Sequence, residues 1–408
     1  MRGGQGKRWI LSMLLALLLF LLSGCGGGQE IESCLFVLSL AVDPAPEGNL
    51  TVTIKALSGT QETGGSSSGS AGGASSAGMP GDESASPRDG EQGGKEQTEP
   101  GYIVMSATAP SCLRALSLLS GTTPRTVNLS QLREIVISRT LAETDATLSI
   151  LKEIHSMYRA NGEAIVVVTP DDAGDFIRRQ RAILGIRLSK YLEVLFDHFS
   201  EIDMIPPHAQ LASVITAMES DVMDAAVVYA AANRFDSPLV LSGAADTDRL
   251  PGHLPRTSPA ENEYLGSAVF SGARMTGVLT GEETGVLCLM MGRAQRRVSF
   301  IGNAQYKANL RTRVRRSIAE DGSLSVFIRM NLTRIAGEQD MLAAEISGRI
   351  EALCVSVLQK LQAASCDAVG FGAIAVRRYP DIASWQAADW NNAYEKLPVH
   401  VTARVKVL

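Results

Sequence analysis

Aromatic residues and the short motifs of catalytic sites are both scarce in this chain. Aromatics make up only 5% of the 408 residues, which argues against the stacking platforms that bind single-stranded nucleic acid. The net charge of −5 also disfavours nucleic acid, because a negative surface repels the phosphate backbone. The 5 histidines are scattered without metal-ligand spacing, and the sequence has no nucleophile elbow, zinc-protease motif or phosphate-binding loop. We therefore predict that the protein is not an enzyme and has no catalytic residues, cofactor or metal site.

The first 24 residues have the pattern of an export signal. Three basic residues precede an apolar run at 10–22, and these 13 residues are too few for a membrane span, which needs roughly 20. The sequence Leu-Ser-Gly then leads into Cys25, which resembles a bacterial lipobox. We expect 1–24 to be a lipoprotein signal peptide and the thiol of Cys25 to be lipidated, so that its acyl chains anchor the protein in a membrane. An ordinary secretory signal is the alternative.

Cysteine is too rare and too irregularly spaced for a disulfide framework or a zinc site. Apart from Cys25, the chain has 5 cysteines, an odd number, and no pair has C-x-x-C spacing. Four of them lie in apolar stretches, so we expect them to be small buried hydrophobic residues. One disulfide is left open as an alternative.

The segment 58–101 differs from the rest of the chain in composition. Its 44 residues include 12 Gly and 9 Ser, and none is Val, Ile, Leu or aromatic. Such a segment cannot bury enough apolar surface to offset the entropy lost on ordering, so we predict that it is disordered. A tolerated insertion between two strands is favoured over a polar brush facing a wall polymer.

Outside that segment, the pattern predicts an α/β protein of the α+β type, with several mixed-sheet subdomains and packed helices. We expect an N-terminal α/β domain at 25–170, a mainly helical middle region and connection at 171–261, and a C-terminal α/β domain at 262–408. Predicted strands are 34–42, 50–57, 102–107, 133–138, 164–168, 264–270, 275–279, 297–301, 305–314, 323–332 and 399–407. Predicted helices are 111–119, 147–159 and 340–364, besides the helical part of the middle region.

The helix predicted at 340–364 is the longest, and its apolar residues recur at steps of 3 and 4 along one face. We expect this amphipathic helix to pack on a sheet, because its other face lacks the basic excess that favours a membrane surface.

Two groups of charged residues have a structural and a functional interpretation. Glu282 and Glu283 stand at the start of a predicted helix, where complementing the helix dipole is favoured over acting as paired catalytic acids. Arg311, Arg313, Arg315 and Arg316 form a basic strip, the first three on one face of a strand. We expect a solvated sheet face there, and an acidic partner or anionic lipid is the alternative.

Three stretches of the chain contain recognisable motifs. They are 264–285, with its glycine-rich strands and Glu-Thr; 367–390, with Asp-Ala-Val-Gly-Phe-Gly followed by Tyr-Pro and two Trp; and, more weakly, 111–142. Together they resemble the Ger(x)C family, the lipoprotein C subunits of bacterial spore germinant receptors. The motif residues, expected to be structural, are Gly266, Phe270, Gly277, Leu279, Glu283, Gly370, Phe371, Gly372, Pro380 and Trp390. The chain is identified as a diverged member, because 29–32 keeps only the Glu-Ile of the family's Trp-Asp-x-x-Glu-Ile sequence.

The residues of the second stretch also allow local expectations. Gly370 and Gly372 should allow close backbone approach at the entrance of a strand. Trp385 and Trp390 should lie on one short helix and cap the core.

The resemblance implies a non-catalytic, lipid-anchored subunit that works with two integral-membrane subunits in a nutrient-sensing receptor. It would lie on the outer face of the cytoplasmic membrane, in spores the inner spore membrane, and act in assembly or signal relay. Its small-molecule ligand, if it has one, is unknown. The alternative is a lipid-anchored solute-binding protein of a transporter, which would need two similar lobes around a ligand crevice. An anchored hydrolase would need converging acids or a nucleophile, and the sequence offers neither.

Overall fold

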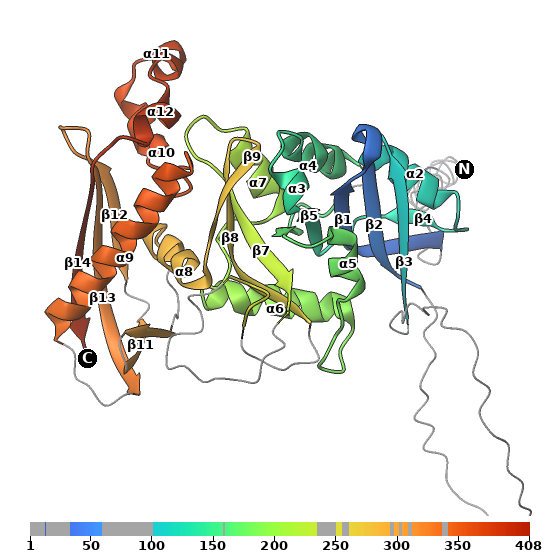
Figure 1. The fold of residues 1–408 in the computed structure, drawn as a ribbon, viewed down its shortest axis with the longest axis horizontal. Helices are drawn as coiled ribbons and strands as arrows, with labels where there is room; N and C mark the ends of the chain where they lie inside the picture. Colours follow the sequence, from blue (N-terminus) through green and yellow to red (C-terminus); the bar gives the residue numbers. More distant parts are fainter. Residues whose placement is uncertain are drawn as a thin grey trace, which may run out of the picture.

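The computed structural model describes Met13 and residues 33–58, 101–157, 160–234, 250–254, 261–293, 298–301, 304–308, 312–336 and 342–408. Cys25, nearly all of the predicted signal peptide and 59–100 of the predicted disordered segment lie outside the described residues. The described part forms two mixed β-sheets with helices packed against them, which confirms the α/β class (Figure 1). None of the helices in these ranges is long and apolar enough to span a bilayer.

The first sheet has nine strands in the order β3-β2-β1-β5-β6-β7-β8-β9, with the short β4 paired to β1. The strands are β1 (Cys34–Pro44), β2 (Leu50–Leu57), β3 (Tyr102–Ala109), β4 (Thr126–Asn128), β5 (Glu134–Ser138), β6 (Ile165–Thr169), β7 (Ala226–Ala232), β8 (Asn262–Ser271) and β9 (Arg274–Leu279). Strands β1, β5, β6 and β7 run parallel to one another, and antiparallel pairs flank them on both sides. A short 3-10 helix, η2 (Pro46–Gly48), joins β1 to β2.

Helices cover both faces of this sheet, as the alternation of its buried side chains requires. In β5, Ile135 and Ile137 enter one hydrophobic core and Val136 enters another on the opposite face. The first core is completed by α2 (Cys112–Ser120), α3 (Arg139–Ala142), α4 (Thr147–Ser156) and α7 (Leu211–Met218). The second is completed by α5 (Ala173–Arg178) and α6 (Leu188–Glu201).

The second sheet has five strands built around β13. They are β10 (Val298–Ile301), β11 (Ala304–Ala308), β12 (Arg313–Ile318), β13 (Leu324–Ala336) and β14 (Val399–Val407). The long helix α9 (Ala343–Ala363) packs on one face, together with α8 (Gly281–Met290) and the short helices α10 (Gly372–Ala375), η3 (Val376–Arg378), α11 (Ile382–Ala387) and α12 (Trp390–Tyr394). In Figure 1 this unit lies at the opposite end of the described part from β2 and β3.

Most predicted elements are confirmed, and three local predictions are wrong. The strand predicted at 305–314 is two strands, β11 and β12, both antiparallel to β13. Trp385 and Trp390 lie on two helices, α11 and α12, because Asp389 between them has φ +45° and interrupts the helix. Gly372 begins the helix α10, so the glycine pair does not stand at a strand entrance.

The expected division of the chain at 262 stays a prediction. Strands β8 and β9 lie after that position, and they extend the first sheet by antiparallel pairing with β7. β7 itself had not been predicted from the sequence.

The start of α8 joins that helix to α9. Thr280 and Glu283 form a capping box: the Thr280 hydroxyl accepts from the Glu283 N–H at 3.2 Å, and Glu283 Oε2 accepts from the Thr280 N–H at 2.8 Å. Lys360 Nζ of α9 donates to both carboxylate oxygens of Glu283, at 3.0 and 2.7 Å. The predicted dipole role of Glu283 is thus accompanied by a helix–helix contact.

We expect Glu283→Ala to lower the free energy of unfolding by about 1–2 kcal/mol, because it removes half of the capping box as well as the ion pair. Lys360→Ala is the matched control and should cost less than about 1 kcal/mol, because its side chain is 45% exposed. Urea denaturation measures both. Equal losses in the two variants would contradict a dominant role for the cap.

Candidate functional site at the junction of the two sheets

The loop that follows α9 is folded around the buried carboxylate of Asp367. Its Oδ1 accepts hydrogen bonds from the backbone N–H groups of Gly370 and Phe371, both at 2.9 Å. Its Oδ2 accepts from the N–H of Gly372 at 2.6 Å and from the indole Nε1 of Trp390 at 3.1 Å. Gly370 has φ +82°, the left-handed conformation that glycine adopts without strain. One acid therefore fixes three successive backbone amides and an aromatic ring.

Asp224, two residues before β7, binds this loop from the side of the first sheet. Its Oδ2 accepts from the N–H of Asp367 at 2.8 Å, and its own N–H donates to the Asp367 carbonyl at 3.2 Å. Its Oδ1 accepts from the N–H of Gly272 in the β8–β9 turn at 3.0 Å. Three segments that are distant in sequence thus meet at two carboxylates, and we call this contact the junction.

Close backbone packing at the junction requires glycine at position 372. A Cβ on Gly372 would lie 2.6 Å from the carbonyl oxygen of Val222 and 2.8 Å from the Trp390 Nε1. A Cβ on Gly277 in β9 would lie 3.4 Å from the Cβ of Ala364, directly after α9, which is an ordinary van der Waals distance. Of these two glycines, only Gly372 therefore meets the backbone of another segment too closely for a side chain.

Burial determines the electrostatics of the junction. It raises the pKa of Asp367 to about 7, although the N–H groups of Gly372 and Phe371 act in the opposite direction. It also raises the pKa of Asp224 above its ordinary value. Asp367 is only 1% exposed, so its carboxylate is satisfied by the loop and by Trp390 and not by solvent. The hydrogen bonds of the two acids therefore connect segments of the protein to one another.

An aromatic row completes the outer side of the junction. Trp385 stacks on Trp390, with ring centroids 5.7 Å apart, and meets Tyr379 edge to face at 5.3 Å. Tyr394 continues the row at 5.9 Å from Trp390. Although the two Trp lie on different helices, both are buried in the second core.

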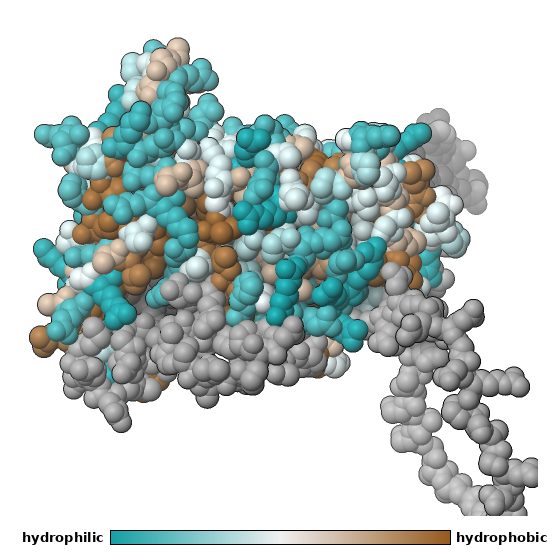
Figure 2. Space-filling view, in the orientation of Figure 1, coloured by the Kyte–Doolittle hydropathy of each residue, from teal (hydrophilic) through white to brown (hydrophobic). Residues whose placement is uncertain are grey.

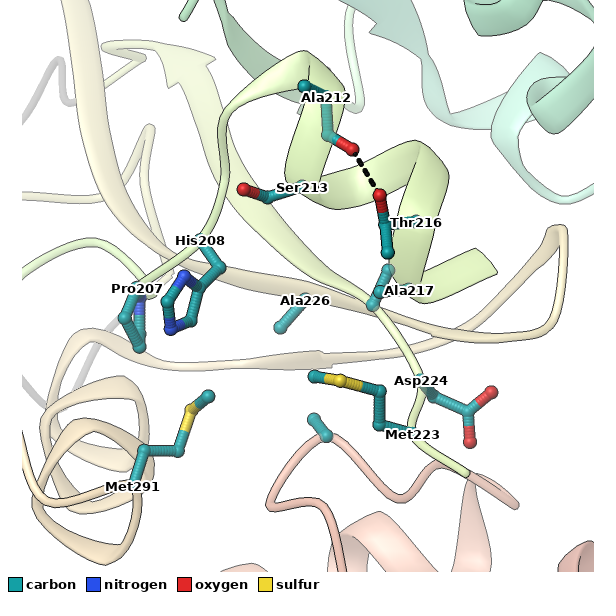
Figure 3. A pocket seen from close by; sticks show the side chains of 12 residues that line it. Pro207, His208, Ala212, Ser213, Thr216, Ala217, Met223, Asp224, Ala226 and Met291 are labelled. Carbon is teal, nitrogen blue, oxygen red and sulfur yellow. Dashed lines mark hydrogen bonds between the residues drawn. The ribbon is translucent and has the colours of Figure 1, made fainter. Parts of the chain in front are cut away.

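A cavity of about 360 Å³ lies beside the junction (Figure 3). Its walls are mostly small or apolar, from α7, the start of β7 and Met291 at the end of α8. His208 faces it from one side, whereas the carboxylate of Asp224 points away from it. His208 Nε2 lies 3.3 Å from an Arg293 nitrogen, and burial with this positive charge lowers the pKa of His208. Ser213 and Thr216 also line the cavity, and among the described residues no hydrogen bond joins either hydroxyl to His208.

A second buried polar cluster lies within the first sheet. The carboxylate of Glu134 accepts from Ser39 Oγ at 2.7 Å, from Tyr264 OH at 3.1 Å and from the side-chain amide of Gln180. Lys55 Nζ donates to the backbone carbonyl of Gln180. Burial raises the pKa of Glu134, and the three side-chain hydrogen bonds oppose that rise. All of these side chains are buried. Their hydrogen bonds connect β1, β2, β5 and β8 to the residues directly after α5.

The motif residues predicted from the sequence fall in two groups. Phe270 and Gly277 converge with Gly370, Phe371 and Gly372 near the junction, where the Phe270 N–H donates to the carbonyl of Ala225 at 3.0 Å. The others lie apart from it or at its rim: Gly266 against Leu279, Glu283 at the α8 cap, Pro380 on the surface and Trp390 on Asp367.

The sequence does not identify Asp224, Glu134, Lys55 or Gln180 as members of these clusters. No motif includes them, and the sequence alone does not distinguish a buried acid from a solvent-facing one. Within the described ranges, no three His, Cys, Asp or Glu side chains are grouped so that they could hold a metal ion. The 5 described cysteines are all buried.

Comparison with known proteins gives two family matches. A model described as the spore germination protein N-terminal domain matches residues 27–232, and one described as spore germination B3/GerAC-like, C-terminal, matches residues 265–408. Among solved structures, the chain is similar to one described as the crystal structure of the GerBC protein, with 12% identity and a TM-score of 0.45 over 90% of this chain and 96% of that one. No match was found among curated proteins.

Proposed function

The chain belongs to the Ger(x)C (GerAC) family of spore germination proteins, and from this membership we propose that it is a non-catalytic, lipid-anchored subunit of a nutrient germinant receptor. The observation that carries the proposal is the pair of domain matches, over residues 27–232 and 265–408. All three segments that meet at the junction lie within these matched ranges. Its task in the receptor is assembly or signal relay.

The chemistry of the described residues supports a mechanical role. The acids of the junction and of the Glu134 cluster accept hydrogen bonds from the protein's own backbone and side chains. Carboxylates whose hydrogen bonds are all made within the protein stabilise its fold. A catalytic acid, by contrast, must come within hydrogen-bond distance of a substrate atom. A rigid junction between two sheets would pass a displacement from one sheet to the other.

The proposed partners are the membrane, through lipidated Cys25, and two integral-membrane receptor subunits. The proposed location is the outer face of the cytoplasmic membrane, which in spores is the inner spore membrane. A small-molecule ligand is not part of the proposal.

A deletion strain complemented with variants tests this function. We expect the strain to lose its response to one nutrient, wild-type chain to restore it, and Cys25→Ala to leave most of the chain out of the membrane fraction and the response lost. Ser23→Ala is the control, since it keeps a small residue before the cysteine. Germination by a treatment that bypasses nutrient receptors should be normal in every strain.

Two outcomes would contradict the proposal. Unchanged responses of the deletion strain to all nutrients, in a background without related receptor genes, would remove the receptor role. A normal response with unlipidated Cys25→Ala would remove the anchor.

A further inference from the structure

The face of the second sheet that α9 does not cover carries exposed side chains. In β13, Leu324, Val326 and Ile328 are buried in the core with α9, so the residues between them point to the opposite face. The pairing of β13 with β12 and β14 extends this alternation to both neighbours. The uncovered face is therefore formed by one alternate set of residues from each strand.

Basic residues dominate that face. Arg313, Arg329 and Arg404 are direct register partners on three adjacent strands, so they form a row about 10 Å wide at the usual strand spacing. We call the following exposed residues the cationic face: Lys307, Arg313, Arg315, Arg329, His400, Arg404 and Lys406. Arg316 of the predicted basic strip points the other way, donating to the carbonyl of Val369, and Arg311 lies outside the described residues.

Acids are absent from the outward positions of the strands that form this face. The outward positions of β12, β13 and β14 include no Asp or Glu. Asp321 lies in the turn between β12 and β13, where hydrogen bonds from Ser323 and the charge of His400, at the edge of the face, lower the pKa of its carboxyl. Glu351 of α9 lies on the other side of the sheet, where its Oε1 accepts from the N–H of Ala403 at 2.7 Å. Arg313, Arg329 and Arg404 form no ion pair with a described residue. The chain as a whole carries −5, so this face is opposite in sign to the rest of the protein.

An aromatic ring lies at the centre of the charges. Phe327 is half-buried on this face, and the guanidinium carbon of Arg404 lies 5.5 Å from its ring centroid. The face thus offers a broad cationic plane around one apolar side chain.

We propose that the cationic face docks on the anionic phospholipid headgroups of the bilayer and so orients the protein body on the membrane. This inference rests on the proposed function, because the lipid on Cys25 would hold the protein close to the bilayer. A plane of charge spread over three strands is complementary to a plane of headgroups, whereas an extended acidic peptide would contact only one row. Each basic residue near an anionic membrane contributes about 1 kcal/mol, enough in total to fix an orientation.

The test uses the full mature chain carrying Cys25→Ser, so that binding reflects the protein surface without the anchor. We expect it to bind vesicles of equal parts phosphatidylglycerol and phosphatidylcholine, and not to bind vesicles of pure phosphatidylcholine. High salt should dissociate it from the anionic vesicles. The triple variant R313E/R329E/R404E should bind about 100-fold more weakly. The control R114E/R187E/R349E makes the same charge change at exposed sites on other elements and should bind like the parent chain. Circular dichroism verifies that both variants are folded.

Any of three results would overturn the inference. They are equal binding by the two triple variants, equal binding to the two vesicle types, and tight binding of soluble polyglutamate without binding to vesicles. The last would assign the face to an acidic protein segment. Because the assay contains neither the lipid anchor nor a receptor subunit, its failure is separate from a failure of the proposed receptor function.

Discussion

Gly266→Ala is expected to destabilise the protein by about 3–5 kcal/mol. Gly266 lies in β8 at φ +97°, a conformation that L side chains rarely adopt, which alone costs on the order of 1–3 kcal/mol. An added Cβ would also approach the carbonyl oxygen of Leu279 more closely than the 3.0 Å below which such contacts essentially do not occur. That oxygen belongs to the backbone of β9, so the strand pair must shift to make room.

The loss is large compared with the roughly 5–15 kcal/mol that stabilises a typical folded protein. Chemical denaturation of the purified chains measures it. Gly348→Ala in α9 is the matched control, because its Cβ would meet nothing within 4 Å. It should raise the stability by about 0.5–1 kcal/mol, as alanine favours a helix. A Gly266→Ala chain as stable as wild type would show that β8 and β9 are not held this closely.

Asp367→Asn is expected to lower the stability by about 2–4 kcal/mol and to change its dependence on pH. Asparagine keeps one acceptor oxygen but turns an amide N–H₂ toward donors such as Gly372 and Trp390, so buried N–H groups lose their partner. Asp381→Asn is a control in which an exposed N-cap acid is replaced by another good capping residue.

The pH dependence follows from the raised pKa of Asp367. Between its ordinary value of 3.8 and about 7, the folded chain holds a proton that the unfolded chain has released. This contribution to stability is therefore complete below 3.8 and is lost as the pH rises toward 7, by at most about 1.4 kcal/mol per pH unit. Asp367→Asn cannot titrate, so its stability should fall less steeply across this window. Parallel curves for wild type and variant would contradict the assignment.

Local patterns made much of the fold predictable. The strands predicted at 50–57 and 399–407 coincide with β2 and β14, because alternating apolar residues are typical of a β-strand. The apolar stripe of α9 likewise requires a helix. By contrast, β7 has 4 Ala among 7 residues and little strand propensity of its own. Its conformation is determined by pairing with β6 and β8, and this pairing cannot be recognised from the sequence of β7 alone.

The candidate site was predictable only in part. The second motif stretch contains Asp367 and its glycines, but the partner Asp224 lies 143 positions earlier in an unremarkable segment. Lys55 occupies a polar position of an alternating strand and would be expected in solvent. It is buried because α5 covers that face of β2, which depends on the tertiary fold.

The strand order of the first sheet determines where a recombinant fragment of this protein can end without exposing a strand edge. The N-terminal family match ends at residue 232, which is also the last residue of β7. A recombinant piece stopping there would leave one whole side of β7 without its hydrogen-bonding neighbour, and a long, apolar open edge invites intermolecular pairing and aggregation. A fragment extended through Leu279 would retain β8 and β9, which cover this edge of β7, and should be more soluble.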